Sequence, residues 1–279
     1  QADFNCVKRN LGQSLGLVKR KRLSVIDVFA LESPFATEFR RLLYKLEQAR
    51  GDRELKSLLM TSAMLSEGKS TASAFLAITA ATHKGMNTLL IDCDLRRPSI
   101  HKLFALDREP GLSEVLVEGY GPRDAVHHTS IDKLDIMTCG RMHDTPTEIF
   151  DAEAIGVMVE QMKLYYDLIL LDAAPILPVS DPMLLSSKVD GVILVIKAGA
   201  TQKDVILRAV DVIDPGRRNI LGVVLNNMNS SLPSQYDYRY YGYDYKPSKP
   251  EGKAPPRVRK RGEKKSRRQN EQDTYASDR

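Results

Sequence analysis

Residues 57–71 read SLLMTSAMLSEGKST, and this stretch decides the fold. It begins with a short apolar run, typical of a buried strand, and passes into helix-forming residues from Lys69 to about residue 83. Between them stands the pattern A-x-x-x-x-G-K-S, a phosphate-binding loop with alanine in place of its first glycine. The alternative is a chance G-K-S-T at the start of a helix, which would not need the strand before it.

The phosphate-loop interpretation gives each residue type a role. Backbone N–H groups of the loop and the N-terminus of the helix would face nucleotide phosphates. Lys69 would reach the β- and γ-phosphates, and the Ser70 hydroxyl would bind Mg²⁺. The predicted nucleotide contacts in this loop are Ala63, Ser66, Glu67, Gly68, Lys69, Ser70 and Thr71.

Carboxylates follow two further apolar runs. Asp92 and Asp94 end the run LLIDCD, and Asp172 ends the run LILLD. Ligands of open α/β sheets bind outside the carboxyl ends of the strands, and three carboxylates gathered there repel one another unless a divalent cation joins them. Mg²⁺ prefers oxygen ligands and fits such a place. The alternative for Asp92 and Asp94 is loop capping or a surface salt bridge with the arginines that follow.

The rest of the chain alternates strands and helices. Its apolar runs are continuous, which is typical of strands buried on both faces in a mostly parallel sheet flanked by helices. The predicted fold class is therefore α/β, of the phosphate-loop nucleotide-hydrolase type. Further strands are predicted at 87–91, 134–137, 168–171, 192–196 and 220–225, and helices at 34–50, 69–83, 146–164 and 202–213.

Charge separates the two ends from the body. The formal net charge is +5, but residues 1–22 carry +5 and residues 246–279 carry +7, so the rest carries −7. The basic ends therefore do not make the body a nucleic-acid surface. The predicted organisation is a basic lead over 1–24, a nucleotide-binding domain over 25–230, a tyrosine cluster over 231–245 and a basic disordered tail over 246–279.

Composition excludes several other classes of protein. With 42% hydrophobic and 28% charged residues, the 279-residue chain has the composition of an ordinary globular protein. It has no apolar run of membrane-spanning length, and it begins without a signal pattern for export. Its three cysteines are scattered, which argues against a disulfide framework or a cysteine zinc site and fits a reducing cytoplasm.

Together the motifs resemble the bacterial tyrosine autokinases of capsule and exopolysaccharide assembly. The resemblance covers about residues 30–245. It is carried by TSAMLSEGKST at 61–71, LLIDCDLRRPSIH at 89–101, GLSEVL at 111–116, PTEIF at 146–150, YDLILLDAAP at 166–175, VDGVILV at 189–195 and the terminal tyrosines.

The resemblance implies an ATP- and Mg²⁺-dependent protein-tyrosine kinase. In that family's pattern, Asp92 takes the tyrosine proton, while Asp94 and Asp172 hold the metal with Ser70. Asn226 would contact the nucleotide base. Four positions depart from the pattern: Leu65 and Ser66 replace a proline and a glycine of the phosphate loop, Ala174 replaces a proline, and Tyr44 replaces an arginine of an oligomerisation motif. If Ser66 has a positive φ, it carries strain that glycine would avoid.

Six of the eleven tyrosines lie within ten residues, at Tyr236, Tyr238, Tyr240, Tyr241, Tyr243 and Tyr245. Asp, Arg and Gly separate them, which argues for an exposed segment. A stacking surface for nucleic acid or sugar, or a low-complexity tail, are the alternatives, and two aspartates in the segment oppose a polyanion. For a kinase, acceptors tethered to the nucleotide site have a high effective concentration, so the cluster is predicted to be phosphorylated by the protein itself.

The resemblance also implies partners. These are a transmembrane polysaccharide chain-length regulator as activator, further copies of the chain, with a ring as one arrangement, and a protein-tyrosine phosphatase; no nucleic acid is expected. The implied location is the cytoplasmic face of the plasma membrane. One alternative is a partitioning or septum-positioning ATPase of the same fold, but such proteins carry an extra lysine where this chain has Met64. A non-catalytic scaffold is the other.

Overall fold

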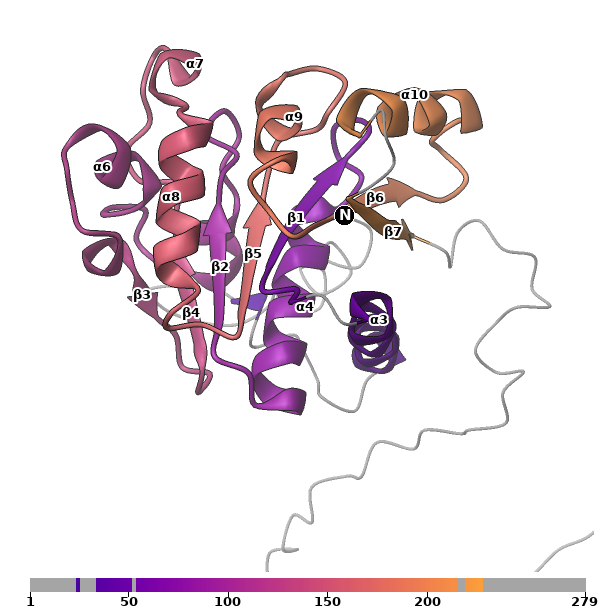
Figure 1. The fold of residues 1–279 in the computed structure, drawn as a ribbon, viewed down its shortest axis with the longest axis horizontal. Helices are drawn as coiled ribbons and strands as arrows, with labels where there is room; N and C mark the ends of the chain where they lie inside the picture. Colours follow the sequence, from indigo (N-terminus) through magenta and orange to yellow (C-terminus); the bar gives the residue numbers. More distant parts are fainter. Residues whose placement is uncertain (1–23, 26–33, 52–53, 215–218, 228–279) are drawn as a thin grey trace, which may run out of the picture. The chain divides into compact units, whose positions relative to one another are not determined.

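The computed structural model describes residues 24–25, 34–51, 54–214 and 219–227. Its centre is a seven-stranded sheet in the order β3-β4-β2-β5-β1-β6-β7 (Figure 1). All neighbouring strands run parallel except β3 and β4, which are antiparallel. The strands are β1 (Ser57–Ser62), β2 (Thr88–Asp92), β3 (His127–His128), β4 (Leu134–Met137), β5 (Leu168–Asp172), β6 (Gly191–Lys197) and β7 (Ile220–Asn226).

Helices cover both faces of this sheet, which confirms the predicted α/β class. The helices are α3 (Pro34–Arg50), α4 (Lys69–Lys84), α5 (Ile100–Phe104), α6 (Leu112–Val117), α7 (Pro146–Ile149), α8 (Ala152–Met162), α9 (Asp181–Ser186) and α10 (Lys203–Ile213), with a short 3₁₀ turn η1 (Pro122–Ala125). Among the helices within the described ranges, none has the length and apolarity that a membrane crossing needs.

The predicted single helix over residues 146–164 is wrong. The chain forms two helices there, α7 and α8, which are separated at Phe150 and Asp151. Asp151 is the N-cap of α8, and its carboxylate accepts hydrogen bonds from the backbone N–H groups of Glu153 and Ala154. An aspartate that caps a new helix competes with continuation of the preceding one, so the break has a local cause.

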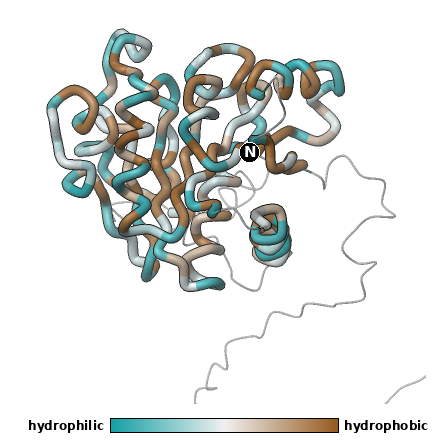
Figure 2. The backbone as a smooth tube through the Cα atoms, in the orientation of Figure 1, coloured by the Kyte–Doolittle hydropathy of each residue, from teal (hydrophilic) through white to brown (hydrophobic). Residues whose placement is uncertain are grey.

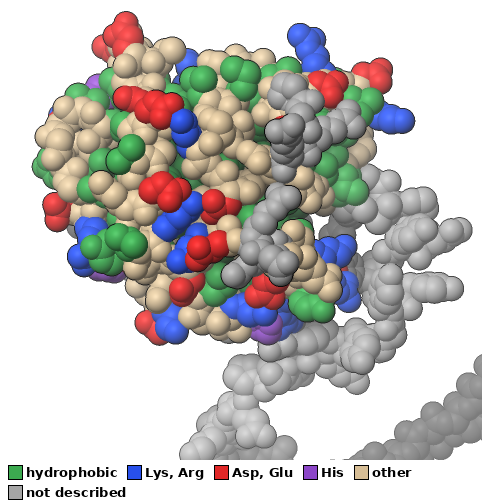
Figure 3. All heavy atoms as spheres, viewed as in Figure 1, with side chains coloured by type: hydrophobic (Ala, Val, Ile, Leu, Met, Phe, Trp, Pro, Cys, Tyr) green, Lys and Arg blue, Asp and Glu red, His purple; other side chains and the backbone are tan. Residues whose placement is uncertain are grey.

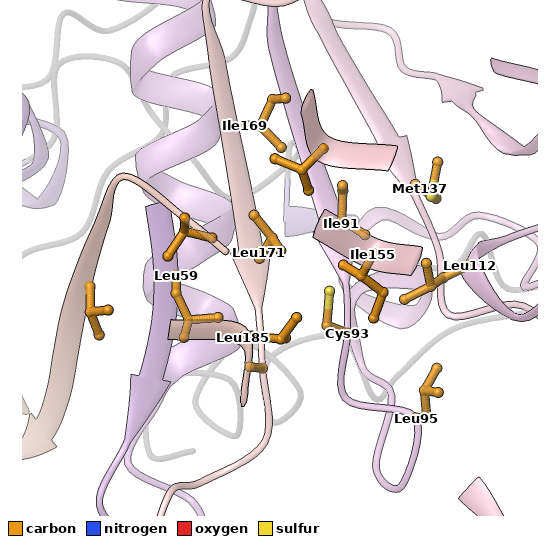
Figure 4. Close-up of a cluster of buried hydrophobic side chains, with 14 of the residues drawn as sticks. Leu59, Ile91, Cys93, Leu95, Leu112, Met137, Ile155, Ile169, Leu171 and Leu185 are labelled. Carbon is orange, nitrogen blue, oxygen red and sulfur yellow. The ribbon is translucent and has the colours of Figure 1, made fainter. Parts of the chain in front are cut away.

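Alternate strand residues pack into two separate cores. On one face, Leu59, Ile91 and Leu171 lie in a cluster with side chains of α8 and α9 (Figure 4). Side chains of α10 belong to the same cluster. On the other face, strand residues such as Met60 and Leu90 pack with side chains of α3 and α4. The central strands are hydrophobic along their length, whereas α3 carries many hydrophilic residues (Figure 2). The result is a three-layer arrangement that holds the sheet rigid beneath its loops.

The register of the sheet brings the predicted carboxylates to one edge. Asp92 lies opposite Asp172 across β2 and β5, and Met60 of β1 lies opposite Asp172 on its other side. The carboxyl ends of β1, β2 and β5 are therefore neighbours, as the sequence predicts.

On the face drawn in Figure 3, acidic and basic side chains are intermingled.

Two groups of sequence predictions lie outside the described residues. The boundaries at 230/231 and 245/246 fall there, and so do the six clustered tyrosines.

On α3, Glu38 and Arg41 form an exposed pair at 2.6 Å, three residues apart. Tyr44, the departure in the oligomerisation motif, is 57% exposed on the same helix.

Candidate active site

The loop between β1 and α4 contains two residues in the left-handed conformation. Ser66 has a φ of 63° and Gly68 a φ of 90°. Gly68 is the N-cap of α4, and a Cβ added to it would lie 2.0 Å from Asn226 Nδ2. Glycine is thus required at position 68 by both conformation and space. Ser66 meets the condition for strain, at a cost of roughly 1 kcal/mol that glycine would avoid.

Glu67 lies inside the protein rather than toward the space above the loop. Its side chain is buried, and its carboxylate accepts hydrogen bonds from the Met64 N–H at 2.6 Å, the Lys197 N–H at 3.4 Å and the Thr201 hydroxyl. Asn226, at the end of β7, donates from Nδ2 to the Glu67 carbonyl at 2.8 Å. Both side chains therefore fix the shape of the loop from beneath, and the backbone of Glu67 is what remains to face a ligand.

Lys69, the first residue of α4, lies among carboxylates. Its Nζ is 3.0 Å from Asp94 Oδ2, 3.3 Å from Asp172 Oδ2 and 3.2 Å from the Ser70 hydroxyl. Its side chain is 11% exposed, while those of Asp94 and Asp172 are 4% and 0% exposed. The structure thus brings together the phosphate-loop lysine, its neighbouring hydroxyl and carboxylates from two strand ends, as the sequence predicts.

The electrostatics of this cluster are dominated by burial and by excess negative charge. Burial alone would lower the pKa of Lys69, but the Asp172 and Asp94 carboxylates outweigh it and raise that pKa above its ordinary value. Burial raises the pKa of Asp172, with Lys69 acting in the opposite direction. Three buried carboxylates share one ammonium group, so the cluster is short of positive charge.

Asp92 is fully buried and is held by the loop that follows it. Its Oδ2 accepts hydrogen bonds from the backbone N–H groups of Ser99 and Ile100, each at 3.0 Å. Its Oδ1 has one longer contact, 3.2 Å from the Asp94 N–H. Burial, followed by repulsion from Asp172, raises the pKa of Asp92 to about 7. A carboxyl group with a pKa near neutrality is suited to taking up and releasing protons.

The donor set fits a magnesium ion that also binds phosphate, and does not fit a metal held by protein alone. In the described ranges, no group of three His, Cys, Asp or Glu side chains is arranged to hold a metal ion. Mg²⁺ is usually bound through one or two carboxylates together with substrate phosphates. The Ser70 hydroxyl and the charge-deficient pair Asp94 and Asp172 supply ligands of that kind.

Sequence reasoning missed several residues that organise this edge of the sheet. Ser73 donates its hydroxyl to Asp172 Oδ1 at 3.1 Å, and its position one helical turn after Lys69 is the signal that could have found it. Arg96 contacts Asp181 at 3.3 Å and Thr147 at 2.8 Å, which ties the loop after β2 to α9 and α7. No spacing in the sequence relates these last three residues.

The remaining predicted contacts lie around the loop. Ala63 is fully buried at the end of β1, so only its backbone is available. Thr71 is exposed on the first turn of α4. Within the described residues, the predicted nucleotide-binding residues therefore surround one place, which is the junction of β1, α4 and the ends of β2 and β5.

No protein-family model matches the chain. A curated relative does: the tyrosine-protein kinase YwqD of Bacillus subtilis is 33% identical over 219 residues, which cover 78% of this chain and 92% of the relative. The chain belongs to the bacterial tyrosine-protein kinases. It is thus an enzyme of the protein-tyrosine kinase class, and the alignment spans almost the whole relative.

Solved structures that resemble this chain include a kinase domain of the bacterial tyrosine-kinase family. The kinase domain of the Escherichia coli tyrosine kinase ETK has a TM-score of 0.69 and 27% identity, and covers 77% of this chain and 84% of that domain. The septum site-determining protein MinD of Pyrococcus horikoshii, solved with Mg-ADP, has a TM-score of 0.56 and 22% identity, and covers 65% of this chain and 75% of MinD. The latter likeness shows a common fold.

Proposed function

We propose that this bacterial tyrosine kinase transfers the γ-phosphoryl group of ATP to tyrosines of its own segment 236–245. The observation that carries the proposal is the position of Lys69 Nζ, 3.0 Å from Asp94 and 3.3 Å from Asp172 at the N-terminus of α4. With nucleotide phosphates at the loop, the ammonium group would turn from these carboxylates to the phosphates. Backbone N–H groups of the loop and the start of α4 would complete the phosphate site.

Ser70, Asp94 and Asp172 would hold the magnesium ion once Lys69 has turned away. The ion supplies neutralisation of the phosphate charge that develops during transfer. The protein's own contribution is to keep these oxygens fixed, because β2 and β5 are buried throughout and Ser73 holds Asp172. The solved Mg-ADP complex of MinD, which shares the fold, supports the use of a magnesium nucleotide.

Asp92 would accept the proton of the tyrosine hydroxyl. In the transfer, a bond forms between the tyrosine oxygen and the γ-phosphorus, the bond from that phosphorus to the β–γ bridging oxygen breaks, and ADP leaves. The hydroxyl proton passes to Asp92 Oδ1, the oxygen with a single 3.2 Å contact, while the Ser99 and Ile100 N–H groups stay on Oδ2. A pKa of about 7 lets Asp92 take this proton near neutral pH.

The acceptors are the six tyrosines at 236, 238, 240, 241, 243 and 245. Asn226 ends β7 beside the phosphate loop, and Tyr245 is the nineteenth residue after it along the chain. That length reaches at most about 65 Å when extended. The segment can therefore serve as a substrate within one chain or between two copies, with an effective concentration far above that of a free peptide.

The biological setting follows from the resemblance to the kinases of capsule and exopolysaccharide assembly. On this proposal, phosphorylation regulates the polymerisation and export of a polysaccharide. The partners are a transmembrane chain-length regulator that activates the kinase, other copies of the chain and a protein-tyrosine phosphatase that resets it. The protein would act at the cytoplasmic face of the membrane.

Incubation with ATP and Mg²⁺, followed by measurement of both phosphotyrosine and ADP, tests the proposal. The unchanged protein should gain phosphotyrosine, and Lys69→Met should gain none. Lys84→Met is a matched control, because Lys84 lies on the same helix and forms a partly exposed ion pair with Glu47, away from the carboxylates at the strand ends. ADP without phosphotyrosine would instead indicate an ATPase of the septum-positioning type, and neither product a scaffold.

A further inference from the structure

Two of the three carboxylates at the strand ends, those of Asp92 and Asp94, are held by backbone N–H groups. In Asp94, Oδ1 accepts a hydrogen bond from the Arg97 N–H at 2.9 Å, while Oδ2 lies 3.0 Å from Lys69 Nζ. In Asp92, Oδ2 accepts the two backbone bonds of the loop that follows it. Every residue except proline supplies a backbone N–H. The path of the loop after β2 is therefore enough to orient both carboxylates.

The third carboxylate, that of Asp172, is also held through one oxygen, but by a side chain. Its Oδ1 accepts a hydrogen bond from the Ser73 hydroxyl at 3.1 Å, and its Oδ2 lies 3.3 Å from Lys69 Nζ. Ser73 lies on α4, one turn after Lys69, and the side chains of Ser73 and Asp172 are fully buried. The orientation of Asp172 therefore depends on a hydroxyl group that a single substitution removes.

The Ser73 hydroxyl has two acceptors within reach and one proton to donate. The Lys69 carbonyl oxygen lies 2.9 Å from Ser73 Oγ, and Asp172 Oδ1 lies 3.1 Å from it. A carbonyl group inside a helix already accepts a bond from the helix backbone. A buried carboxylate is the stronger acceptor, and it is costly to leave without a donor. Asp172 is therefore the acceptor that gains most from this proton.

We propose that Ser73 is a positioning residue for magnesium binding, an inference that rests on the proposed use of a magnesium nucleotide. Ser73 occupies Oδ1 of Asp172 and thereby keeps Oδ2 turned toward the place where Lys69 Nζ now lies. The serine acts through Asp172 alone, because its hydroxyl is used on the oxygen that does not face Lys69. Removal of a group that orients a metal ligand typically lowers metal affinity by about 10- to 100-fold.

A merely structural role for the Ser73 hydroxyl predicts something different. Thr79 and Thr82, further along α4, show such a role, because each hydroxyl donates to the carbonyl four residues earlier at 2.7 Å. Thr79 is buried, as Ser73 is. Loss of a bond of this kind changes the stability of the helix whether or not a metal is bound. Ser73 differs from both threonines because its hydroxyl also reaches a carboxylate at the end of β5.

Binding of ADP to the full chain, in excess Mg²⁺ and in EDTA, tests the proposal without any turnover. Ser73→Ala should lower the affinity for ADP in Mg²⁺ by at least about tenfold, because Asp172 loses its fixed orientation. The same change should leave the affinity for ADP in EDTA as it is in the unchanged chain. Isothermal titration calorimetry measures both affinities. Alanine is smaller than serine and favours a helix, so α4 is expected to form.

Two control variants separate the hydroxyl from its surroundings. Thr79→Val removes a buried hydroxyl from the same helix and should leave both affinities unchanged. Ser73→Thr keeps the hydroxyl and should keep the affinity measured in Mg²⁺. If Ser73→Ala does not fold, Ser73→Cys replaces it, because a thiol fills the site but is a weak donor.

Two outcomes would overturn the positioning role. One is the same affinity for ADP in excess Mg²⁺ in Ser73→Ala and in the unchanged chain. The other is a loss of affinity in EDTA that is as large as the loss in Mg²⁺, which would assign Ser73 to the shape of the nucleotide loop.

The phosphotyrosine assay separates this proposal from the proposed function. In that assay, Ser73→Ala should need about tenfold more Mg²⁺ for half of its maximal rate. If the chain forms no phosphotyrosine but its affinity for ADP in Mg²⁺ depends on Ser73, the proposed function is refuted and the positioning role stands. If phosphotyrosine forms and Ser73→Ala needs no more Mg²⁺ than the unchanged chain, the positioning role is refuted and the proposed function stands.

Discussion

Among the residues that the structure describes, Lys69 supplies the only ammonium group beside three buried carboxylates, and its replacement by methionine removes that charge. Lys69 Nζ lies 3.0 Å from Asp94 and 3.3 Å from Asp172, and the side chains are almost fully buried. Two unit charges about 3 Å apart attract by roughly 5 kcal/mol at an effective dielectric constant near 20, and desolvation of the lysine offsets part of this. Removing one partner of a buried pair typically costs about 3–5 kcal/mol, which is the destabilisation expected for Lys69→Met at neutral pH.

The stability lost in Lys69→Met should depend strongly on pH. Burial raises the pKa of Asp92 to about 7 and also raises that of Asp172. A carboxyl group whose pKa is higher in the folded protein stabilises the fold while protonated, and loses that contribution as pH rises through the folded pKa. Lys69 lowers the pKa values of Asp92 and Asp172, so both pKa values should rise further in Lys69→Met. The penalty of Lys69→Met should therefore be largest near pH 8 and shrink toward about pH 5.5.

Urea unfolding at these two pH values and constant ionic strength measures the effect. Lys84→Met is the control, because its pair with Glu47 is 36% and 41% exposed and is expected to contribute less than about 0.5 kcal/mol at either pH. The reasoning is refuted if Lys69→Met is as stable as the unchanged protein near pH 8, or if its penalty is the same at both pH values.

Three further predictions concern the same loop and strand ends. Asp92→Asn should abolish phosphotyrosine and should flatten the fall in stability of the nucleotide-free protein between about pH 5 and pH 8, since it removes the buried group whose pKa is raised to about 7; thermal melts at the two pH values check this. Ser66→Gly should raise the stability by about 1 kcal/mol because φ is 63°, whereas Ser66→Ala should not; equal melting temperatures would contradict the strain. Gly68→Ala should destabilise by about 2–3 kcal/mol, because its Cβ would displace Asn226 Nδ2 from the Glu67 carbonyl, and a second change, Asn226→Ala, should recover part of this in urea unfolding.

The sequence predicts the frame of the site because parallel topology leaves little freedom. Continuous apolar runs such as residues 168–171 must be buried on both faces, so their carboxyl ends share one edge with β1. The position of Asp92 and Asp172 at the ends of two such runs is enough to predict that they lie close together. The register of β2 and β5, in which Asp92 lies opposite Asp172, confirms this prediction. The phosphate loop is equally constrained, since a strand, a glycine turn and a helix leave Lys69 at the first helical turn.

What the sequence could not predict depends on partners far away in the chain. Glu67 is a charged residue in a loop of a kind that is usually exposed. Its carboxylate nevertheless points inward, because the Lys197 N–H and the Thr201 hydroxyl donate hydrogen bonds to it there. Asp92 is held by the Ser99 and Ile100 amides rather than open to solvent. The break at Asp151 was missed for a different reason, since the apolar periodicity of residues 146–164 runs through a capping residue.

The most direct test of the central claim is a mass measurement of the intact chain before and after incubation with ATP and Mg²⁺, with the modified residues located by fragmentation. The account predicts that several phosphoryl groups are added and that they lie between Tyr236 and Tyr245. It also predicts that a chain with all six of these tyrosines changed to phenylalanine keeps its nucleotide binding but gains almost no mass. Phosphate that persists in that variant at Tyr44, Tyr120, Tyr165, Tyr166 or Tyr275, or an unchanged mass in the natural chain, would contradict it.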